Sequence, residues 1–251
     1  MKVLLAASFL LALSNGTALA NGINTPQQAQ HLPSAKPKSA KDIARAFEQH
    51  YQRTRTMAGL FLEKYTSGGA GIRVESGKVY FEKPGRMRWD YDSPETKMFL
   101  VDGKNVWYYV PADHTASRTS VKESDDWRTP LALLAGKVKL ERLCGSLALA
   151  NPLAANSANA DPEAKPSAPE NSVLVCGPRK EDADAFRRVL LEVNPQHQLV
   201  RLSIEQPGDV EMEFRFGDWH ENVPIEVGKF RFVPPKGVAI VDDAALASKV
   251  Q

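Results

Sequence analysis

Residues 86–110 read RMRWDYDSPETKMFLVDGKNVWYYV, and this stretch decides the fold. Its first six residues alternate between polar and apolar side chains, which predicts a strand with one face buried and the other in solvent. Ser93-Pro94 then turns the chain, and Asp102-Gly103 is a strong hairpin signal between strands predicted over 97–101 and 105–110. These short connections predict an antiparallel meander.

The same period of two continues on both sides of the meander. Further strands are predicted over 59–65, 72–83, 115–121, 173–176, 186–193, 199–205, 210–216 and 229–232. Helical spacing follows Ser39, an N-cap candidate, and a short apolar helix is predicted from Thr129-Pro130 to Gly136. About ten or eleven antiparallel strands with two or three helices predict a mainly β fold. We expect one strongly curved sheet, with helices against one face and room for a cavity.

The chain start and one internal tract lack this pattern. Residues 1–20 combine Lys2, an apolar run and a small-residue site ending at Ala20, which predicts a secretory signal peptide. The apolar run of about eleven residues is shorter than the ~20 that span a membrane. Residues 21–38 are expected to be a flexible lead-in. The folded domain is expected over 39–251, with a low-complexity insertion near 145–171 that is typical of a disordered loop.

Two cysteines, Cys144 and Cys176, flank this insertion. An exported protein meets an oxidising environment, so one expectation is a disulfide across the base of the loop. The other is a pair of reduced, buried thiols. Two cysteines cannot form a four-thiolate zinc site.

Composition excludes several functional classes. The 251 residues are 43% apolar and 25% charged, and the formal net charge is +2, so no strong field attracts nucleic acid or an acidic partner from a distance. The five histidines are scattered without metal-ligand spacing, and the sequence has neither a GxSxG elbow nor a Walker loop. We therefore expect neither catalysis nor a bound cofactor or metal.

Aromatic residues crowd into the predicted hairpins. They are Trp89, Tyr91, Phe99, Trp107 and Tyr109. Arg86, Arg88 and Lys97 lie among them, a mixture that can bind nucleic acid, but the near-neutral charge and the export signal argue against that interpretation. Two alternatives remain: an ordinary sheet core, or the lining of an apolar ligand cavity.

Five segments of the chain form a familiar set. They are GKVYFEKPGRMRW at 77–89, Pro94, VDGKNVWYY at 101–109, TPL at 129–131 and KFRFVPPKGV at 229–238. In this order they resemble the periplasmic outer-membrane lipoprotein carrier proteins of the LolA family, over about residues 40–243 apart from the insertion. The resemblance implies an unclosed barrel of about eleven antiparallel strands, capped by short helices over an apolar cavity.

The resemblance also implies a function: a periplasmic chaperone, without enzymatic activity and expected to be a monomer, that binds lipoprotein acyl chains. It would take lipoproteins from an inner-membrane ABC transporter complex and hand them to an outer-membrane receptor. Each methylene kept from water contributes about 0.8 kcal/mol, so a chain of about 16 carbons exposed in transit would cost on the order of 12 kcal/mol.

The competing hypothesis is a periplasmic lipid- or lipoprotein-sensing regulatory domain. Proteins of that class usually carry a further C-terminal domain, whereas this sequence ends at Gln251 soon after its last predicted strand. The carrier is therefore the favoured expectation.

The residues expected to line the cavity or its lid are Met87, Trp89, Leu131, Leu134 and Ala135. Structural core is the competing account for each of them. In the family, an arginine before the motif's proline holds the cavity shut by donating hydrogen bonds to lid-helix carbonyls, and this chain has Lys83 there. A lysine can place a cation near a helix C-terminus but lacks the planar five-donor fork. Latching by Lys83 is therefore a hypothesis, and a solvated strand-end lysine is the alternative.

Overall fold

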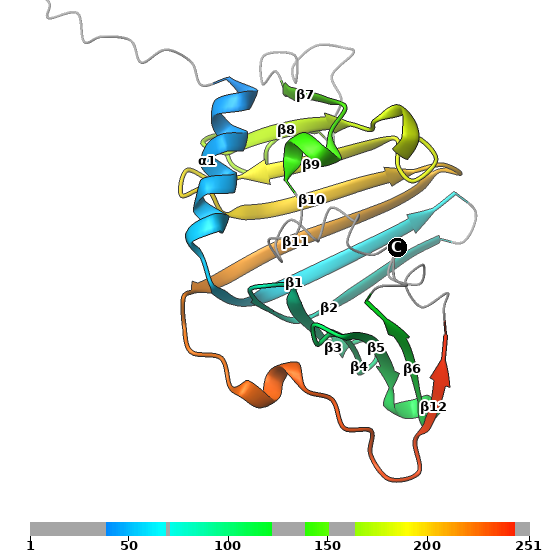
Figure 1. Cartoon of the computed structure of the whole chain (residues 1–251). Helices are drawn as coiled ribbons and strands as arrows, with labels where there is room; N and C mark the ends of the chain where they lie inside the picture. Colours follow the sequence, from blue (N-terminus) through cyan, green and yellow to red (C-terminus); the bar gives the residue numbers. More distant parts are fainter. Residues whose placement is uncertain (1–38, 69–70, 122–138, 151–163, 244–251) are drawn as a thin grey trace, which may run out of the picture. The chain divides into compact units, whose positions relative to one another are not determined.

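A computed structural model of the chain describes residues 39–68, 71–121, 139–150 and 164–243 (Figure 1). All of these residues belong to one of two compact units, Lys38–Gln251, which is described by itself. The signal peptide and lead-in predicted over 1–38 lie outside the described residues, as does the helix predicted from Thr129 to Gly136.

The described residues form twelve strands and a few short helices. The strands are β1 (Thr56–Ser67), β2 (Gly71–Glu82), β3 (Arg86–Ser93), β4 (Lys97–Val101), β5 (Asn105–Val110), β6 (Thr115–Ser120), β7 (Ser146–Leu149), β8 (Ser172–Gly177), β9 (Arg188–Val193), β10 (Leu199–Gln206), β11 (Val210–Glu221) and β12 (Ala239–Asp242). The helices are α1 (Ala40–Arg53), α2 (Leu140–Leu143) and the 3-10 turns η1 (Pro111–Asp113), η6 (Lys180–Asp182) and η7 (Val227–Phe230).

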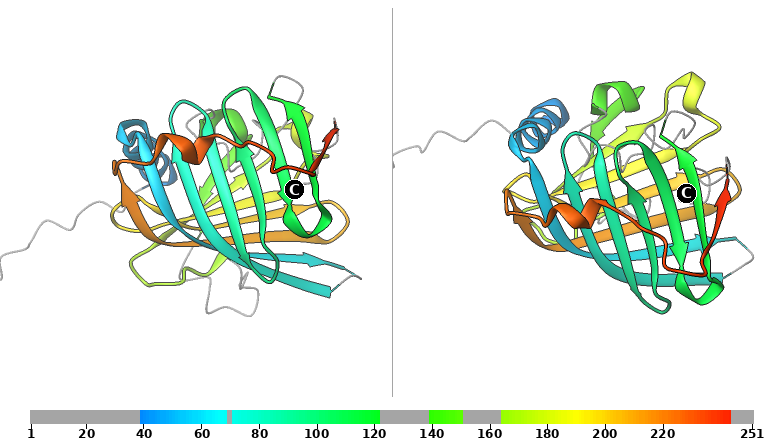
Figure 2. Two further views of the ribbon diagram at one scale, coloured as in Figure 1. Left: turned by 90° about the horizontal axis from the view of Figure 1, so that it is seen from below. Right: turned by 60° about the horizontal axis from the view of Figure 1, so that its bottom comes forward.

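All twelve strands belong to one sheet, in the order β12-β6-β5-β4-β3-β2-β1-β11-β10-β9-β8-β7. It consists of two antiparallel meanders, β1–β6 and β7–β11, which meet where β1 pairs with β11. Figure 2 shows that the sheet is strongly curved. The edge strands β12 and β7 do not pair with each other, so the curved sheet is unclosed. The predicted mainly β, unclosed fold is therefore confirmed. The described strands number one more than expected, and β12 pairs with β6 in parallel.

Helix α1 begins where the sequence predicts. The Asp42 backbone N–H donates to the Ser39 hydroxyl at 3.2 Å, and the Ser39 N–H donates to the Asp42 carboxylate at 3.1 Å, a reciprocal capping box. The helix buries Phe47 and Tyr51 against the sheet, and the Tyr51 hydroxyl accepts a hydrogen bond of 3.0 Å from the Leu199 N–H. We call the face of the sheet that α1 packs on the inner face, and the opposite face the outer face.

The strand predicted over 229–232 is wrong. Phe230 ends η7, and the chain continues without sheet pairing to β12. The alternation that suggested a strand has another cause: Phe230 and Phe232 both pack onto the outer face of the sheet, whereas Arg231 between them is exposed. We call residues 223–235 the aromatic strap; Figure 2 shows it crossing the outer side of the first meander.

The tract expected to be aperiodic from Gly145 begins instead with a strand, β7. Its pairing with β8 and the packing of Leu147 against the core supply the order that the Ala/Asn/Ser-rich sequence does not signal. Cys144 and Cys176 form a disulfide with an S–S distance of 2.10 Å, which joins the start of this tract to β8. The pairing expected from the sequence is thus present.

Candidate functional site

The inner face carries a cluster of aromatic side chains. Because strand residues alternate between faces, Met87, Trp89 and Tyr91 of β3 share the inner one, and Trp89 is only 2% exposed. Four rings surround it, at centroid distances of 4.8 Å (Phe61), 5.6 Å (Phe214), 6.0 Å (Phe81) and 6.0 Å (Phe216). They come from β1, β2 and β11, so the cluster spans the junction of the two meanders.

Trp219 extends this cluster toward α1. Its ring stacks on Phe216 at 5.3 Å, and its indole N–H donates to the Leu199 carbonyl at 2.9 Å. The ring lies directly over Gly59, where an added Cβ would be 2.7 Å from the nearest ring carbon. A glycine is therefore required for β1 to admit this tryptophan.

Two methionines complete the apolar part of the inner face. Met57 and Met87 are 1% and 4% exposed, and both pair in register with Phe81. The thioether side chain is flexible and polarisable, so it adapts to irregular apolar surfaces and to aromatic neighbours. The inner face thus combines rigid rings with two adaptable side chains.

The apolar surface ends in a charged group on β1–β4. The Tyr91 hydroxyl donates to the buried Glu63 carboxylate at 2.8 Å, and the Lys97 ammonium bonds both oxygens of Glu75 at 2.6 and 2.7 Å. The same ammonium lies 4.4 Å from the Tyr91 ring centroid. Burial raises the pKa of Glu63, although the hydrogen bond from Tyr91 opposes the shift.

Lys83 follows the inner-face residue Phe81 by two positions, where β2 has ended. Its backbone N–H donates to the Arg55 carbonyl at 2.9 Å. The side chain is half-buried, and this burial lowers the pKa of the ammonium. No carboxylate within the described ranges forms an ion pair with it.

Of the residues predicted to line the site, the structure places Met87 and Trp89 together on the inner face. Leu131, Leu134 and Ala135 lie outside the described residues. The aromatic crowd of the hairpins divides: Phe99 joins Trp89, but the two members of the set on β5 lie on the outer face.

Trp107 and Tyr109 pack on the outer face against the aromatic strap. Their rings lie 5.4 and 5.1 Å from the Phe232 ring, and the buried Phe230 joins the same cluster. Sequence patterns did not predict that Phe214, Phe216 and Trp219 of β11 join the inner cluster. The alternation over 210–216 put the two phenylalanines on one face, but only the pairing of β1 with β11 brings them to Trp89.

The cations that suggested nucleic-acid binding are paired. Arg86 donates to Glu82 at 2.8 Å, Arg88 donates to Asp90 at 2.7 Å, and Lys97 is held by Glu75 as described above. These charges therefore serve the sheet itself.

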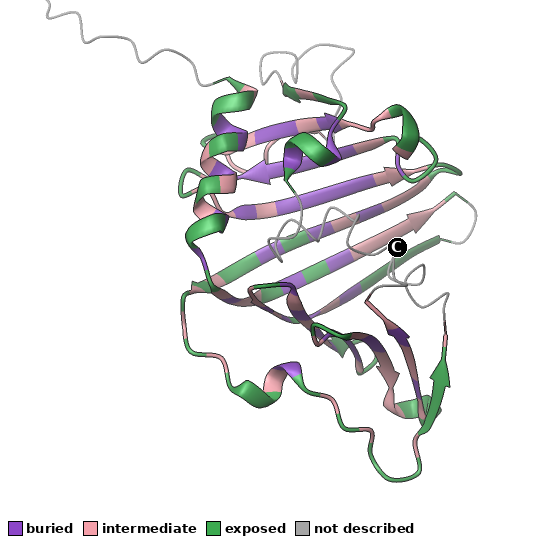
Figure 3. Ribbon diagram, viewed as in Figure 1, coloured by how far each residue is buried: buried purple, intermediate pink, exposed green. Residues whose placement is uncertain are grey.

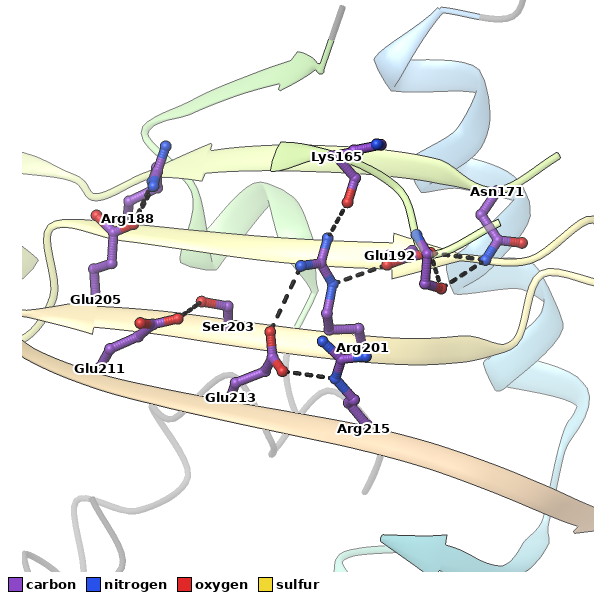
Figure 4. Close-up of polar contacts among 11 residues, drawn as sticks. Lys165, Asn171, Arg188, Glu192, Arg201, Ser203, Glu205, Glu211, Glu213 and Arg215 are labelled. Atoms are coloured by element: carbon purple, nitrogen blue, oxygen red, sulfur yellow. Dashed lines mark hydrogen bonds and ion pairs between the residues drawn. The ribbon is translucent and has the colours of Figure 1, made fainter. Parts of the chain in front are cut away.

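A second polar cluster lies on the outer face of the other meander (Figure 4). Glu192 on β9 is fully buried and accepts hydrogen bonds from Arg201 (2.8 Å), the Ser167 N–H and hydroxyl (2.6 and 2.5 Å) and the Asn171 amide (2.7 Å). Arg201 also donates to the Lys165 carbonyl at 2.8 Å. We call residues 164–171, which make these contacts, the polar cover.

The charge of Glu192 is strongly supported. Burial alone would raise its pKa, but the hydrogen bonds from Ser167 and Asn171, together with the positive charge of Arg201, hold the pKa below its usual value. A buried carboxylate with four donors is thus kept ionised by its partners. This arrangement ties part of the expected insertion to the sheet.

In the part of the chain that the structure describes, no helix is long and apolar enough to cross a membrane.

Comparison with known proteins identifies similar sequences. The family described as outer membrane lipoprotein carrier protein LolA matches residues 52–233. An outer-membrane lipoprotein carrier protein of Nitrosomonas europaea is 29% identical over 174 residues, which cover 68% of this chain and 75% of the relative. One of Chromobacterium violaceum is 25% identical over 237 residues, covering 92% and 97% of the two chains.

Solved structures give weaker likenesses. An uncharacterized conserved protein from Thermus thermophilus has a TM-score of 0.49 at 13% identity, with 81% of this chain and 99% of that chain covered. A LolA superfamily protein from Nitrosomonas europaea has a TM-score of 0.38 at 9% identity, with 77% and 98% covered.

Proposed function

Because the chain belongs to the LolA family of outer membrane lipoprotein carrier proteins, we propose that it is a periplasmic chaperone that binds the acyl chains of lipoproteins. The observation that carries this proposal is the inner face of the unclosed sheet, where Trp89 and the four rings around it form a continuous apolar surface across β1, β2, β3 and β11.

Hydrocarbon recognition needs apolar area more than charge. An acyl chain of about 16 carbons exposed to water would cost on the order of 12 kcal/mol, and an aromatic surface can cover it without strong directional contacts. The paired charges of Glu63, Glu75 and Lys97 bound this surface on one side, so we place the hydrocarbon against Trp89, Phe61 and the two methionines. These side chains are buried in the structure, so binding requires a cavity to open around them when the ligand enters.

The route of the cargo is part of the same proposal. The chain receives lipoproteins released by an inner-membrane ABC complex and passes them to an outer-membrane receptor, and it performs no chemistry on them. Binding and release require only that the apolar surface be covered and uncovered. No turnover of lipoprotein esters is therefore expected.

Fluorescence quenching tests where the ligand binds. Trp89 on the inner face and Trp107 on the outer face are both buried, so Trp89→Phe and Trp107→Phe are matched conservative variants. A diacylglyceryl-cysteine peptide with brominated acyl chains should quench the wild type and Trp107→Phe. The quenching should be reduced in Trp89→Phe, and largely lost when Trp219, the other inner-face tryptophan, is replaced as well. Loss in Trp107→Phe instead would place the ligand on the outer face and contradict the proposal.

Native mass spectrometry of protein isolated from the periplasm tests the cargo. A co-purified lipoprotein supports the carrier. Free lipid without lipoprotein argues for a lipid-sensing role. A chain that carries no ligand, even when transfer of lipoproteins to the receptor is blocked, argues against binding altogether.

We also propose that Lys83 latches the closed state, by donating hydrogen bonds to carbonyls of residues 129–136. Its half-buried ammonium, which has no carboxylate partner among the described residues, supports this role. A lysine holds the closed, empty state less firmly than an arginine would, so release to the receptor should be faster in Lys83→Arg and slower in Lys83→Leu. Unchanged transfer in both variants would remove the latch from the mechanism.

A further inference from the structure

The outer face of the sheet is covered on both sides of its centre. The aromatic strap packs over β2–β5, and the polar cover hydrogen-bonds to β9 and β10. The strap reaches the end of the β1–β2 hairpin at Tyr80 and Thr56, but from Leu60 toward the turn the outer face of the hairpin carries exposed side chains. Figure 3 shows the exposed positions that alternate with buried ones along these central strands.

This region carries aliphatic side chains. Leu60 and Leu62 of β1 are 48% and 42% exposed, and Ile72 and Val74 of β2 are 66% and 48% exposed. Leu62 pairs with Ser76, so Val74 is its diagonal neighbour across the two strands. The four side chains therefore form one staggered line along the hairpin, which we call the hairpin patch. Elsewhere, alternating antiparallel strands place polar residues at such outward positions.

Two lysines flank the hairpin patch. Lys78 lies directly opposite Leu60 in the strand register, and Lys64 lies directly opposite Val74. Neither lysine has an ion pair with any residue that the structure describes. The nearby acids are already engaged: Asp90 with Arg88 and Lys229, and Glu213 with Arg215. The patch thus offers apolar side chains beside two lysines that form no ion pair within the described ranges, although Asp90 and Glu213 lie opposite them in the strand register.

We propose that the hairpin patch is a contact site for the surface of an anionic lipid bilayer. Aliphatic side chains flanked by lysines suit the boundary between headgroups and acyl chains, where each lysine attracts anionic phosphates. A stable protein partner would bury about 800 Å² on each side and favours aromatic and Arg residues over Lys. Four aliphatic residues and two lysines are too few for that, but they suffice for weak, reversible contact with a bilayer.

This inference goes beyond the proposed carrier function. It concerns the outer face, and it holds whether or not the inner face carries an acyl chain. For a carrier, a weak contact would bring the chain to the surface at which its cargo leaves or enters a bilayer.

Vesicle co-flotation tests the proposal. The protein used begins at Asn21, so that the apolar segment predicted to be a signal peptide does not contribute to the binding. Vesicles of phosphatidylethanolamine and phosphatidylglycerol should float part of the protein. Phosphatidylcholine vesicles should not, and added salt should weaken the binding. Lys64→Gln and Lys78→Gln should each reduce the partition coefficient about fivefold. Threonine at all four patch positions, which preserves strand propensity, should reduce it at least about tenfold.

Matched controls come from the same outer surface. Val227 and Val233 are 88% and 74% exposed but lie away from the hairpin, so Val227→Thr and Val233→Thr should leave the binding unchanged. Lys104→Gln and Lys236→Gln are the controls for charge. Circular dichroism and thermal unfolding establish that every variant is folded. The proposal would be overturned if the wild type does not float with the vesicles, or if patch and control variants float equally. It would also be overturned if the patch variants lose binding to a protein but bind vesicles as the wild type does.

Discussion

The two coverings of the outer face solve one problem with opposite chemistry. The aromatic strap covers the first meander with Phe230 and Phe232, whereas the polar cover is fixed to the second meander through Glu192 and Arg201. When an apolar side chain is truncated, the free energy of unfolding falls in proportion to the apolar area that is lost. When one partner of a buried ion pair is removed, the other partner keeps its charge in a buried position without its counter-charge, which costs more. A single substitution in the contacts of the polar cover should therefore destabilise the protein more than one in the aromatic strap.

The largest expected effect comes from breaking the buried pair. Arg201→Met removes the counter-charge of the fully buried Glu192 and leaves it only the donors of Ser167 and Asn171, and we expect a loss of about 3 kcal/mol or more in the free energy of unfolding, measured with denaturant. The double variant Glu192→Leu/Arg201→Met should lose clearly less than the two single variants together.

The control is the partly exposed pair on the same face, between Arg188 and Glu205. Arg188→Gln should cost less than about 1 kcal/mol. If Arg201→Met also costs less than about 1 kcal/mol, the buried pair contributes no more to stability than an ordinary surface ion pair.

The next effect concerns the aromatic strap. Phe230 is 5% exposed, so Phe230→Ala should reduce the free energy of unfolding by about 3 kcal/mol, the lower end of the usual range because the strap can relax toward the sheet. Val233→Ala, at a position 74% exposed, is the control and should stay within about 0.5 kcal/mol. Equal effects of the two variants in thermal unfolding would show that the strap is not anchored by its buried ring.

A somewhat smaller effect is expected from the disulfide. Cys144 and Cys176 are 32 positions apart, and the double variant Cys144→Ala/Cys176→Ala should lose about 2 kcal/mol. We place the loss at the low end because Glu192 still holds the polar cover to the sheet after the bond is removed. If so, the loss should change when Arg201→Met is added, and strictly additive losses would show that the bond and the ion pair act independently.

Acid should separate the two coverings. The pKa of Glu192 is lowered in the folded chain, so its contribution to stability is complete above the ordinary value of 4.5 and disappears as the pH falls through the lower folded value. The protection of backbone amides from hydrogen exchange, corrected for the slower intrinsic exchange in acid, should therefore fall at residues 164–171 on acidification before it falls in the strap. Glu192→Gln should abolish this pH dependence; simultaneous release of both coverings in the wild type would contradict the assignment.

The smallest effect has the opposite sign and lies on the inner face. Burial raises the pKa of Glu63, so its contribution is complete below pH 4.5 and is lost as the pH rises through the higher folded value. Glu63→Gln keeps an acceptor for Tyr91 and removes the buried charge. The variant should therefore gain stability relative to the wild type as the pH rises from acid to neutral, and a constant difference across that range would refute this account.

Sequence patterns predicted every strand of the first meander, although β1 extends beyond its predicted bounds at both ends. The strands over 97–101 and 105–110 have the predicted bounds, because alternation and turn residues are local signals. The same alternation failed over 229–232, since it reports that one side of an extended segment is buried and not that the segment is paired. Sequence patterns also do not show which aromatic residues of distant strands come into contact, because these contacts depend on how the strands pair and in which register.

The candidate site was predictable in part for the same reason. Met87 and Trp89 stand on the inner face because their own strand alternates, whereas Phe214 and Phe216 reach Trp89 only through the pairing of β1 with β11. The polar cover escaped detection because Ser167 and Asn171 are ordinary loop residues. Their order depends on Glu192, which is distant in sequence.

The pairing of β1 with β11 also sets an order of assembly. Strands β1–β6 form contacts between near neighbours in the chain, and such local contacts close quickly. Pairing Met57 with Glu221 and Ser67 with Val210 requires closure of a loop that spans most of the domain, which is slow and cannot begin until β11 has been delivered. A chain that emerges N-terminus first would therefore wait with β1 half-paired, and the aromatic surface around Trp89 would be the last part of the protein to come into existence.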